Sequence, residues 1–219
     1  TRSWTSVDLK NAHLSAVSKT WNIPEVHEFL SAGNSIWTYL QEALGVSSSF
    51  KPALKQAIYS LAFGASKPTV VEPLQVLPQP PTEDDFFNIP FIKQVFDARN
   101  KRLRSIINTG WADIGFDRIV KIEPPKTKDE NYWEKLEKQA RSALALQAQS
   151  LEIQLISPVY DVLENTESKI MLYLFDGLKI RFDSALKSSR HKLQNKLIDA
   201  VQEKADALKI PTTLEINNE

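Results

Sequence analysis

Residues 51–64 read Lys-Pro-Ala-Leu-Lys-Gln-Ala-Ile-Tyr-Ser-Leu-Ala-Phe-Gly. The apolar residues recur at the three- and four-residue spacing of a helix with one buried side, and the closing Gly64 is typical of a helix end. Positions four apart share a helix face, so one face collects four further side chains. These are Lys51, Lys55, Tyr59 and Phe63. The stretch therefore predicts a helix over 51–63 that presents two cations and two aromatic rings together, although a merely solvated face is the plainer alternative.

The composition is that of an ordinary packed protein. Hydrophobic residues make up 42% and charged residues 25% of the 219 residues, which excludes collagen-like, fully disordered and disulfide-scaffold classes. The 27 basic side chains balance 27 acidic ones, so a polyanionic partner would have to be held by a local basic patch. The absence of cysteine removes disulfides, thiolate zinc sites and cysteine nucleophiles.

Targeting signals are not visible in the sequence. No run approaches the roughly 20 apolar residues that span a bilayer, and residues 1–20 lack the pattern of a signal peptide. We therefore expect no membrane partner and take a cytoplasmic location as the default. The only methionine is Met171 and the chain begins with Thr1, so we expect a piece of a longer product.

The sequence around the 51–63 helix predicts further helices and one early strand. A strand-like stretch at 3–9 runs into helical spacing over 12–19, and helical pieces follow Pro24 and cover 36–44. Residues 67–84 hold five prolines and an acidic run, which a regular helix or a central strand does not accept. We expect a long exposed loop there.

The second half predicts two long helices and two hairpins. Helical spacing with several basic residues covers 89–108, and 111–122 suits a small hairpin. The longest helix is expected over 132–163, with a kink at Ser157-Pro158. Residues 169–182 form two β-type runs hinged at Asp176-Gly177, a strong short hairpin signal. A helix over 184–208 and a strand over 211–216 follow.

Familiar catalytic motifs are missing. His13, His27 and His191 lie too far apart and too unpatterned to predict a zinc site. The sequence contains neither the Gly-x-Ser-x-Gly turn of many hydrolases nor a phosphate-binding Gly-Lys-Ser/Thr loop. Hydrolase and ATPase assignments therefore lose their usual support.

The joint order of three features is more specific than any one of them. Asp8 ends a strand, a lysine-bearing helix follows about 45 residues later, and Asp176 stands on a hairpin near the C-terminus. This order resembles the three polymerase motifs of the family A DNA polymerases, the DNA polymerase I type. The stretch from Val7 to Leu14 occupies the position of that family's first motif and shares its aspartate and one leucine.

The helix over 51–63 gives the best match to this family. Its fingers helix has Arg, then Lys four residues on, then an aromatic residue four further, then Tyr-Gly, and Lys51, Lys55, Tyr59, Phe63 and Gly64 are similar in kind and spacing. Arg141 and Gln149 fall where the family has an arginine and a glutamine that touch template and primer. In the third motif, typically His-Asp-Glu, Phe175-Asp176-Gly177 keeps only the aspartate.

The resemblance implies an α+β fold, a small antiparallel palm sheet carrying the two aspartates and backed by helices, with a helical fingers subdomain. It implies a first palm part over 1–46, fingers over 47–123 and a C-terminal palm over 124–219. It further implies template-directed DNA synthesis with two Mg²⁺ ions about 4 Å apart. Primer-template DNA, dNTPs and an upstream thumb and palm segment, in the same polypeptide or a companion chain, are the implied partners.

The resemblance also assigns roles to residues. Asp8, Asp176 and Lys55 would be catalytic, and Asp8, Leu9 and Asp176 would hold the metal. The nucleotide would contact Lys51, Lys55, Tyr59, Phe63 and His13. Arg141, Gln149 and Arg118 would contact nucleic acid, and the other candidates for the duplex backbone are Arg99, Lys101, Arg102 and Arg104.

Three alternatives stay open at this point. His13 stands where the family has a glutamate that excludes the 2′-hydroxyl, and its bulk favours deoxynucleotides, but a single-subunit RNA polymerase shares this palm and lysine helix. The altered first and third motifs would also suit a nucleic-acid-binding module that has lost catalysis. A plain helical interaction domain is the remaining alternative.

Overall fold

The computed structural model describes residues 4–126, 131–174, 177–182 and 187–218. The chain divides into two compact units, one formed by Thr1–Ala16 with Gln149–Glu219 and the other by Val17–Ala148. Both boundaries fall inside helices, namely α1 (Ala12–Thr20) and α8 (Tyr132–Ile156). These cuts differ from the subdomain limits expected from the sequence, which stay a prediction.

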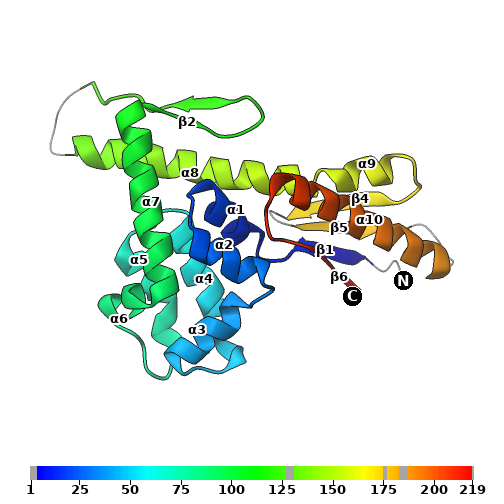
Figure 1. Ribbon diagram of the computed structural model, residues 1–219, viewed down its shortest axis with the longest axis horizontal. Helices are drawn as coiled ribbons and strands as arrows, with labels where there is room; N and C mark the ends of the chain where they lie inside the picture. Colours follow the sequence, from blue (N-terminus) through cyan, green and yellow to red (C-terminus); the bar gives the residue numbers. More distant parts are fainter. Residues whose placement is uncertain (1–3, 127–130, 175–176, 183–186, 219) are drawn as a thin grey trace. The chain divides into compact units, whose positions relative to one another are not determined.

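The first unit contains a small antiparallel sheet (Figure 1), so the expected α+β class is confirmed. Its strands lie in the order β4-β5-β1-β6. Their bounds are β1 (Thr5–Leu9), β4 (Lys169–Leu174), β5 (Gly177–Arg181) and β6 (Leu214–Asn218). The expected hairpin over 169–182 is confirmed as the antiparallel β4–β5 pair, in which Leu174 is opposite Gly177.

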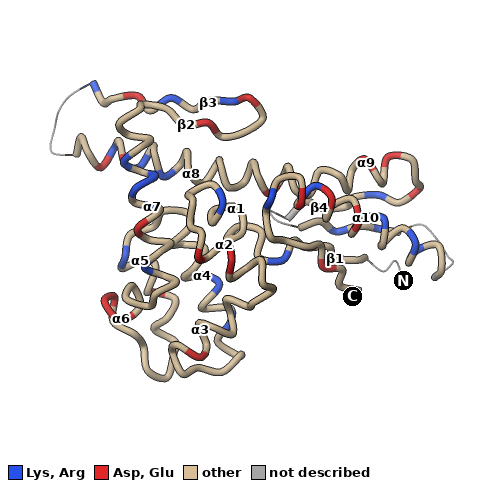
Figure 2. The backbone as a smooth tube through the Cα atoms, in the orientation of Figure 1, with Lys and Arg blue, Asp and Glu red and all other residues tan. Residues whose placement is uncertain are grey.

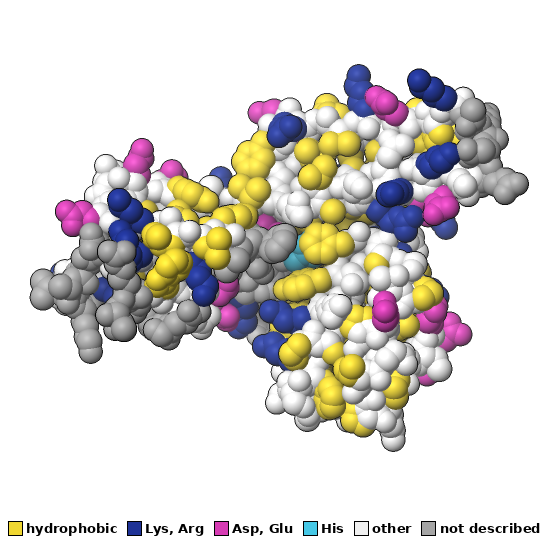
Figure 3. Space-filling model, turned by 180° about the vertical axis from the view of Figure 1, so that it is seen from behind, with side chains coloured by type: hydrophobic (Ala, Val, Ile, Leu, Met, Phe, Trp, Pro, Cys, Tyr) yellow, Lys and Arg dark blue, Asp and Glu magenta, His cyan; other side chains and the backbone are white. Residues whose placement is uncertain are grey.

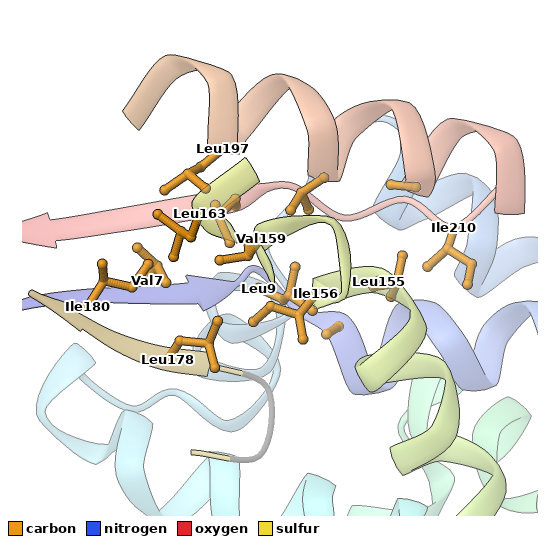
Figure 4. Packing of buried hydrophobic residues seen from close by; sticks show 14 residues of the cluster. Val7, Leu9, Leu155, Ile156, Val159, Leu163, Leu178, Ile180, Leu197 and Ile210 are labelled. Carbon is orange, nitrogen blue, oxygen red and sulfur yellow. The ribbon is translucent and has the colours of Figure 1, made fainter. Parts of the chain in front are cut away.

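The core of this unit lies against one face of the sheet. Val7 and Leu9 of β1 and Leu178 and Ile180 of β5 are at most 3% exposed and pack into one apolar cluster. Figure 4 shows these side chains meeting residues from the end of α8, from α9 (Pro158–Glu164) and from α10 (Lys187–Leu208). Burial of each such side chain contributes about 1.5–3 kcal/mol. Because strand residues alternate between faces, this core fixes which β1 side chains point the other way.

The second unit is built mainly from helices around α4. Its elements are α2 (Pro24–Ser31), α3 (Ile36–Leu44), η1 (Ser48–Phe50), α4 (Lys51–Ala62), α5 (Lys67–Val71), η2 (Glu72–Val76), α6 (Glu83–Asn88), α7 (Pro90–Thr109), β2 (Trp111–Asp113) and β3 (Ile119–Lys121). The expected helix at 51–63 is thus confirmed as α4. Its apolar stripe, including Leu54, Ile58 and Leu61, is at most 1% exposed.

The expected long loop over 67–84 is wrong. Pro68 and Pro73 stand in the first turns of α5 and η2, where the missing backbone N–H has no helical partner in any case. Val70 and Leu74 are fully buried, so this segment supplies core rather than exposed chain. Proline breaks a helix in its interior but is accepted in the first turn.

The acidic run at the end of that segment is also helical. Thr82 and Asp85 form a capping box at the start of α6: the Thr82 hydroxyl accepts the Asp85 N–H at 3.1 Å, and the Asp85 carboxylate accepts the Thr82 N–H at 3.2 Å. Such a box satisfies two of the unpaired donors at a helix start. The Thr-x-x-Asp spacing was the missed signal.

The next helices and strands lie close to the ranges that the sequence predicts. The expected helix over 89–108 is α7, and 111–122 contains the paired strands β2 and β3. The helix expected over 132–163 is broken at Ser157 into α8 and α9. Among the described helices, none is both long enough and apolar enough to cross a membrane.

Candidate active site

Asp8 lies near the end of β1, on the face of the sheet opposite the apolar core. The burial pattern of β1 alternates, with Val7 and Leu9 buried and Asp8 partly exposed. In the sheet register, Asp8 is opposite Gly177 of β5 on one side and Glu215 of β6 on the other. Residues directly opposite in an antiparallel pair share a face. The strand thus presents one carboxylate beside the residue that follows Asp176.

The Asp8 carboxylate leans over Gly177. A Cβ built at position 177 would lie 3.1 Å from the Asp8 Cγ and closer still to its Oδ1. It would also lie 2.9 Å from the carbonyl oxygen of Val7. A side chain at this position would therefore displace the Asp8 carboxylate, because carbon atoms normally stay about 3.5–4.0 Å apart. The close approach of Asp8 therefore favours glycine at position 177.

Only part of the expected metal site lies within the described residues. Asp8 offers the hard carboxylate oxygens that Mg²⁺ prefers. The Leu9 side chain is 3% exposed and lies in the core, so only its backbone carbonyl could act as a ligand. Asp176 lies outside the described residues. Within the described ranges no group of three or more His, Cys, Asp or Glu side chains could hold a metal ion, so the expected Mg²⁺ site stays a prediction.

His13 is built into the first unit as a buried side chain. Its ring is 2% exposed, and Nδ1 lies 2.9 Å from the carboxylate of Glu152, which is itself 4% exposed. Glu152 comes from α8, 139 residues later in the sequence. This partner was missed because the sequence gives no sign of it, and contact of His13 with a nucleotide sugar stays a prediction.

In the second unit, the apolar and the polar side chains of α4 lie on different sides of the helix. Lys51 and Lys55 are exposed, whereas Tyr59 and Phe63 are partly buried on the same side. The Lys55 Nζ lies 5.9 Å from the ring centroid of Tyr59 and 6.0 Å from that of Trp37. A cation within about 6 Å of an aromatic ring is attracted by it. The expected grouping of two cations and two rings on one face is therefore present.

Tyr59 and Phe63 share a hollow with Arg141 of α8. This hollow of about 720 Å³ is lined by residues 56, 59, 60 and 63–65 at the end of α4 and by residues 138, 141, 142 and 145 of α8. The close packing of α4 against Arg141 requires a glycine at position 64, because a Cβ there would come within 2.8 Å of the Arg141 Cγ. Gly64 also has φ +86°, a left-handed conformation that favours glycine. The structure thus joins the α4 motif with Arg141, which the sequence could not establish.

The expectation that Arg99 contacts the backbone of a DNA duplex is wrong. Only 6% of it is exposed, and its Nη1 donates to the carbonyls of Leu61 (3.3 Å) and Ala65 (2.9 Å). Burial lowers the pKa of Arg99 to about 10; the charge of Arg141 acts in the same direction and that of Glu137 opposes it. A side chain held in this way is not free to contact a DNA backbone. It instead ties the end of α4 to α7.

The two other expected nucleic-acid contacts lie elsewhere. Arg118 is exposed at the turn of the β2–β3 hairpin, where its N–H donates to Gly115 at 3.0 Å. Gln149 is partly exposed on α8. Lys138, which lines the hollow beside Arg141, was not singled out from the sequence although it lies three residues before Arg141.

Charges of both signs are spread over the described surface. Figure 3 shows basic and acidic side chains interspersed with hydrophobic ones on the face that it draws. This agrees with a net charge of zero. Binding of a polyanion therefore depends on local groups of cations such as the pair lining the α4–α8 hollow.

No protein-family model matches the chain, and no curated protein matches it. Among solved structures, it is similar to the POL domain of Pol1 from M. smegmatis, in complex with DNA primer-template and dNTP. The TM-score is 0.74 over 99% of this chain, with 13% sequence identity. The chain spans 39% of the length of that polymerase chain. At this identity, the likeness establishes a shared fold alone.

Proposed function

We propose that this chain is the catalytic core of a template-directed DNA polymerase. The observation that carries the proposal is the position of Asp8: in a fold like that of a polymerase domain, its carboxylate lies on the sheet face opposite the core and beside Gly177. Asp176 is bonded to Gly177 in the chain. A two-metal nucleotidyl transfer requires carboxylates that lie close together, and in this proposal Asp176 supplies the second one.

In the proposed reaction the primer 3′-oxygen attacks the α-phosphorus of a dNTP. A new P–O bond forms, the bond to the bridging oxygen breaks, pyrophosphate leaves and the hydroxyl proton passes to solvent. Asp8 and Asp176 would hold two Mg²⁺ ions, which when bound supply activation of the hydroxyl and neutralisation of the triphosphate. Lys55 would add positive charge at the phosphates, where negative charge develops. Its loss should therefore lower the rate more than the affinity.

The hollow between α4 and α8 supports binding of a nucleotide. Tyr59 and Phe63 supply aromatic rings, and Lys138 and Arg141 supply cations in the same hollow. Base stacking on an aromatic ring contributes about 1–3 kcal/mol. In this account Lys51 assists Lys55 at the phosphates, and Gln149 and Arg118 contact nucleic acid.

The finer assignments belong to this proposal. We assign 1–46 and 124–219 to the palm and 47–123 to the fingers. A thumb and the remaining palm would come from the same polypeptide or a companion chain. A deoxynucleotide substrate is the preferred assignment, with His13 as the residue that limits the sugar.

The proposal is tested by Mg²⁺-dependent primer extension with the full-length parent of this chain. We expect Asp8→Asn to abolish extension while primer-template binding persists. The matched control is Glu215→Gln, which removes the carboxylate opposite Asp8 in the sheet. The Glu215 carboxylate lies 4.0 Å from the Lys10 Nζ, and we expect the Glu215→Gln variant to retain activity. Extension with ribonucleotides only would instead favour an RNA polymerase. Binding without any extension in the wild type would refute the proposed activity and favour a degenerate binding module.

A further inference from the structure

A further hollow of the second unit is lined by more cations than acids, and we call it the cation hollow. It has a volume of about 400 Å³ and lies between the connection from α4 to α5, one side of α7, and α8. Figure 2 shows basic positions on α5, α7 and α8. A volume between about 300 and 1,000 Å³ is usual for a ligand-binding pocket. The charged residues that line the hollow are Lys67, Arg99, Arg104, Glu137 and Arg141.

Arg99 is the buried cation of this hollow. In the described part of the chain its guanidinium donates to neutral acceptors: Nη1 to two backbone carbonyls, and Nε and Nη2 to the side-chain oxygen of Asn100. Burial lowers the pKa of Arg99 to about 10; the charge of Arg141 acts in the same direction and that of Glu137 opposes it. A buried charge is costly unless an opposite charge compensates it. An anion in the hollow would supply that compensation.

Aromatic rings hold Lys67 and Arg99 in place. The Lys67 Nζ lies 5.0 Å from the ring centroid of Phe87 and 5.4 Å from that of Phe96. The Arg99 Cζ lies 4.6 Å from the Phe96 centroid, and the two rings contact each other with centroids 4.7 Å apart. An aromatic ring attracts a cation but does not neutralise its charge. Both cations are therefore positioned before any ligand binds, which lowers the ordering cost of binding.

The acidic side chains nearby do not balance these cations. Of the described residues that line the hollow, Glu137 is the acidic one, and its Oε2 lies 3.8 Å from the Arg141 Nη2. Asp97, the acid of α7, lines a different hollow. Lys67 and Arg104 form no ion pair with another described residue. Arg104 is exposed and Lys67 is partly exposed, so an anion from solvent can reach both.

We infer that the cation hollow is a binding site for a phosphate group, which Lys67, Arg104 and Arg141 contact. A guanidinium presents paired donors that match phosphate oxygens, and such charge-assisted hydrogen bonds are strong. Lys51 and Lys55, the phosphate contacts of the proposed function, do not line this hollow. The inference therefore does not rest on the proposed function. A free polyphosphate and a nucleic-acid strand present the same oxygens, and the test separates these two sources.

Isothermal titration calorimetry with the full-length parent measures the binding. Every protein in the comparison carries Lys51→Gln/Lys55→Gln, so that the phosphate contacts proposed for the active site do not contribute. The probes are inorganic pyrophosphate, a single strand of about ten thymidines, and citrate as an anion without phosphate. The salt concentration is about 0.1 M, at which exposed charges more than about 10 Å apart are largely screened.

Three pairs of substitutions are compared in this background. Lys67→Gln/Arg104→Gln removes two charges from the cation hollow. Lys67→Arg/Arg104→Lys keeps both charges and controls for packing. The matched control is Lys93→Gln/Lys121→Gln, which removes two exposed lysines of the same unit that do not line the hollow.

We expect Lys67→Gln/Arg104→Gln to weaken binding of a phosphate probe about 10- to 100-fold, because two charged donors are lost. The charge-keeping variant and the matched control should change the affinity less than about threefold. A loss that includes pyrophosphate supports a site for a free anion, and a loss on the thymidine strand alone supports a site for a nucleic-acid backbone.

Four results would overturn the inference. These are no binding of either phosphate probe by the background protein, no loss on either probe, the same loss in the charge-keeping variant or the matched control, and an equal loss on citrate. Because binding is measured without catalysis, a failure of the proposed polymerase activity leaves this test intact.

Discussion

Gly64→Ala tests the contact that joins α4 to Arg141. Gly64 has φ +86°, and the left-handed conformation costs an alanine about 1–2 kcal/mol. The new Cβ would lie 2.8 Å from the Arg141 Cγ and 3.2 Å from its Cβ and Cδ. Since these atoms are near the backbone of α8, the arginine cannot simply swing away. Overpacking of this kind costs about 1–3 kcal/mol, so we expect a total loss of about 2–5 kcal/mol in the free energy of unfolding.

Gly110→Ala is the matched control for this substitution. Gly110 has φ +73° at the end of α7, and a Cβ there meets nothing within 4 Å. It should therefore show the backbone cost alone, about 1–2 kcal/mol. Urea unfolding monitored by two probes gives both values. In an Arg141→Ala background, Gly64→Ala should cost about 1 kcal/mol less than in the wild type. Equal losses for the two glycine substitutions, or no coupling to Arg141, would refute the contact.

Three further predictions concern stability and selectivity. Leu74→Ala should cost about 2–5 kcal/mol of unfolding free energy, because Leu74 is fully buried. As a control, Val76→Ala should cost less than about 0.5 kcal/mol, because Val76 is 66% exposed. Arg99→Leu should cost about 2–3 kcal/mol of unfolding free energy, because the carbonyls of Leu61 and Ala65 lose a charged donor. Urea unfolding measures the stability of all three variants. His13→Ala should raise ribonucleotide incorporation relative to deoxynucleotide incorporation in single-nucleotide kinetics, because a smaller side chain excludes the 2′-hydroxyl less well.

Each of these predictions can fail plainly. A Leu74→Ala variant as stable as Val76→Ala would mean that η2 is not part of the core. An Arg99→Leu variant of wild-type stability would show that the carbonyls of Leu61 and Ala65 need no charged donor. Unchanged sugar selectivity in His13→Ala, with the protein still folded, would leave His13 the purely structural partner of Glu152.

Local patterns in the sequence carried much of the fold. The four-residue spacing from Lys51 to Phe63 was enough to predict α4 and its mixed face, because helix geometry alone brings such residues together. The Asp176-Gly177 dipeptide between two β-type runs likewise predicted the β4–β5 hairpin. The prolines misled the prediction for 67–84. A proline breaks a helix when it lies in the interior, but Pro68 and Pro73 lie in the first turns of α5 and η2.

Long-range contacts in the candidate site could not be predicted in the same way. Arg99 looked like one of several exposed cations on α7, yet it bonds carbonyls 34 and 38 residues earlier in the chain. The pairing of His13 with Glu152 spans 139 residues. Helix periodicity does not say which polar side chain meets which partner from another element. Only the packing of those elements decides it, and the same holds for Gly64 beneath Arg141.

Templated incorporation of a single nucleotide tests the central claim most directly. The full-length parent is given Mg²⁺, one labelled dNTP at a time and four primer-templates that differ only in the templating base. The account predicts that each template directs incorporation of its complementary nucleotide, and that Asp176→Asn abolishes all four reactions. Addition that ignores the template, or activity that survives Asp176→Asn, would contradict it.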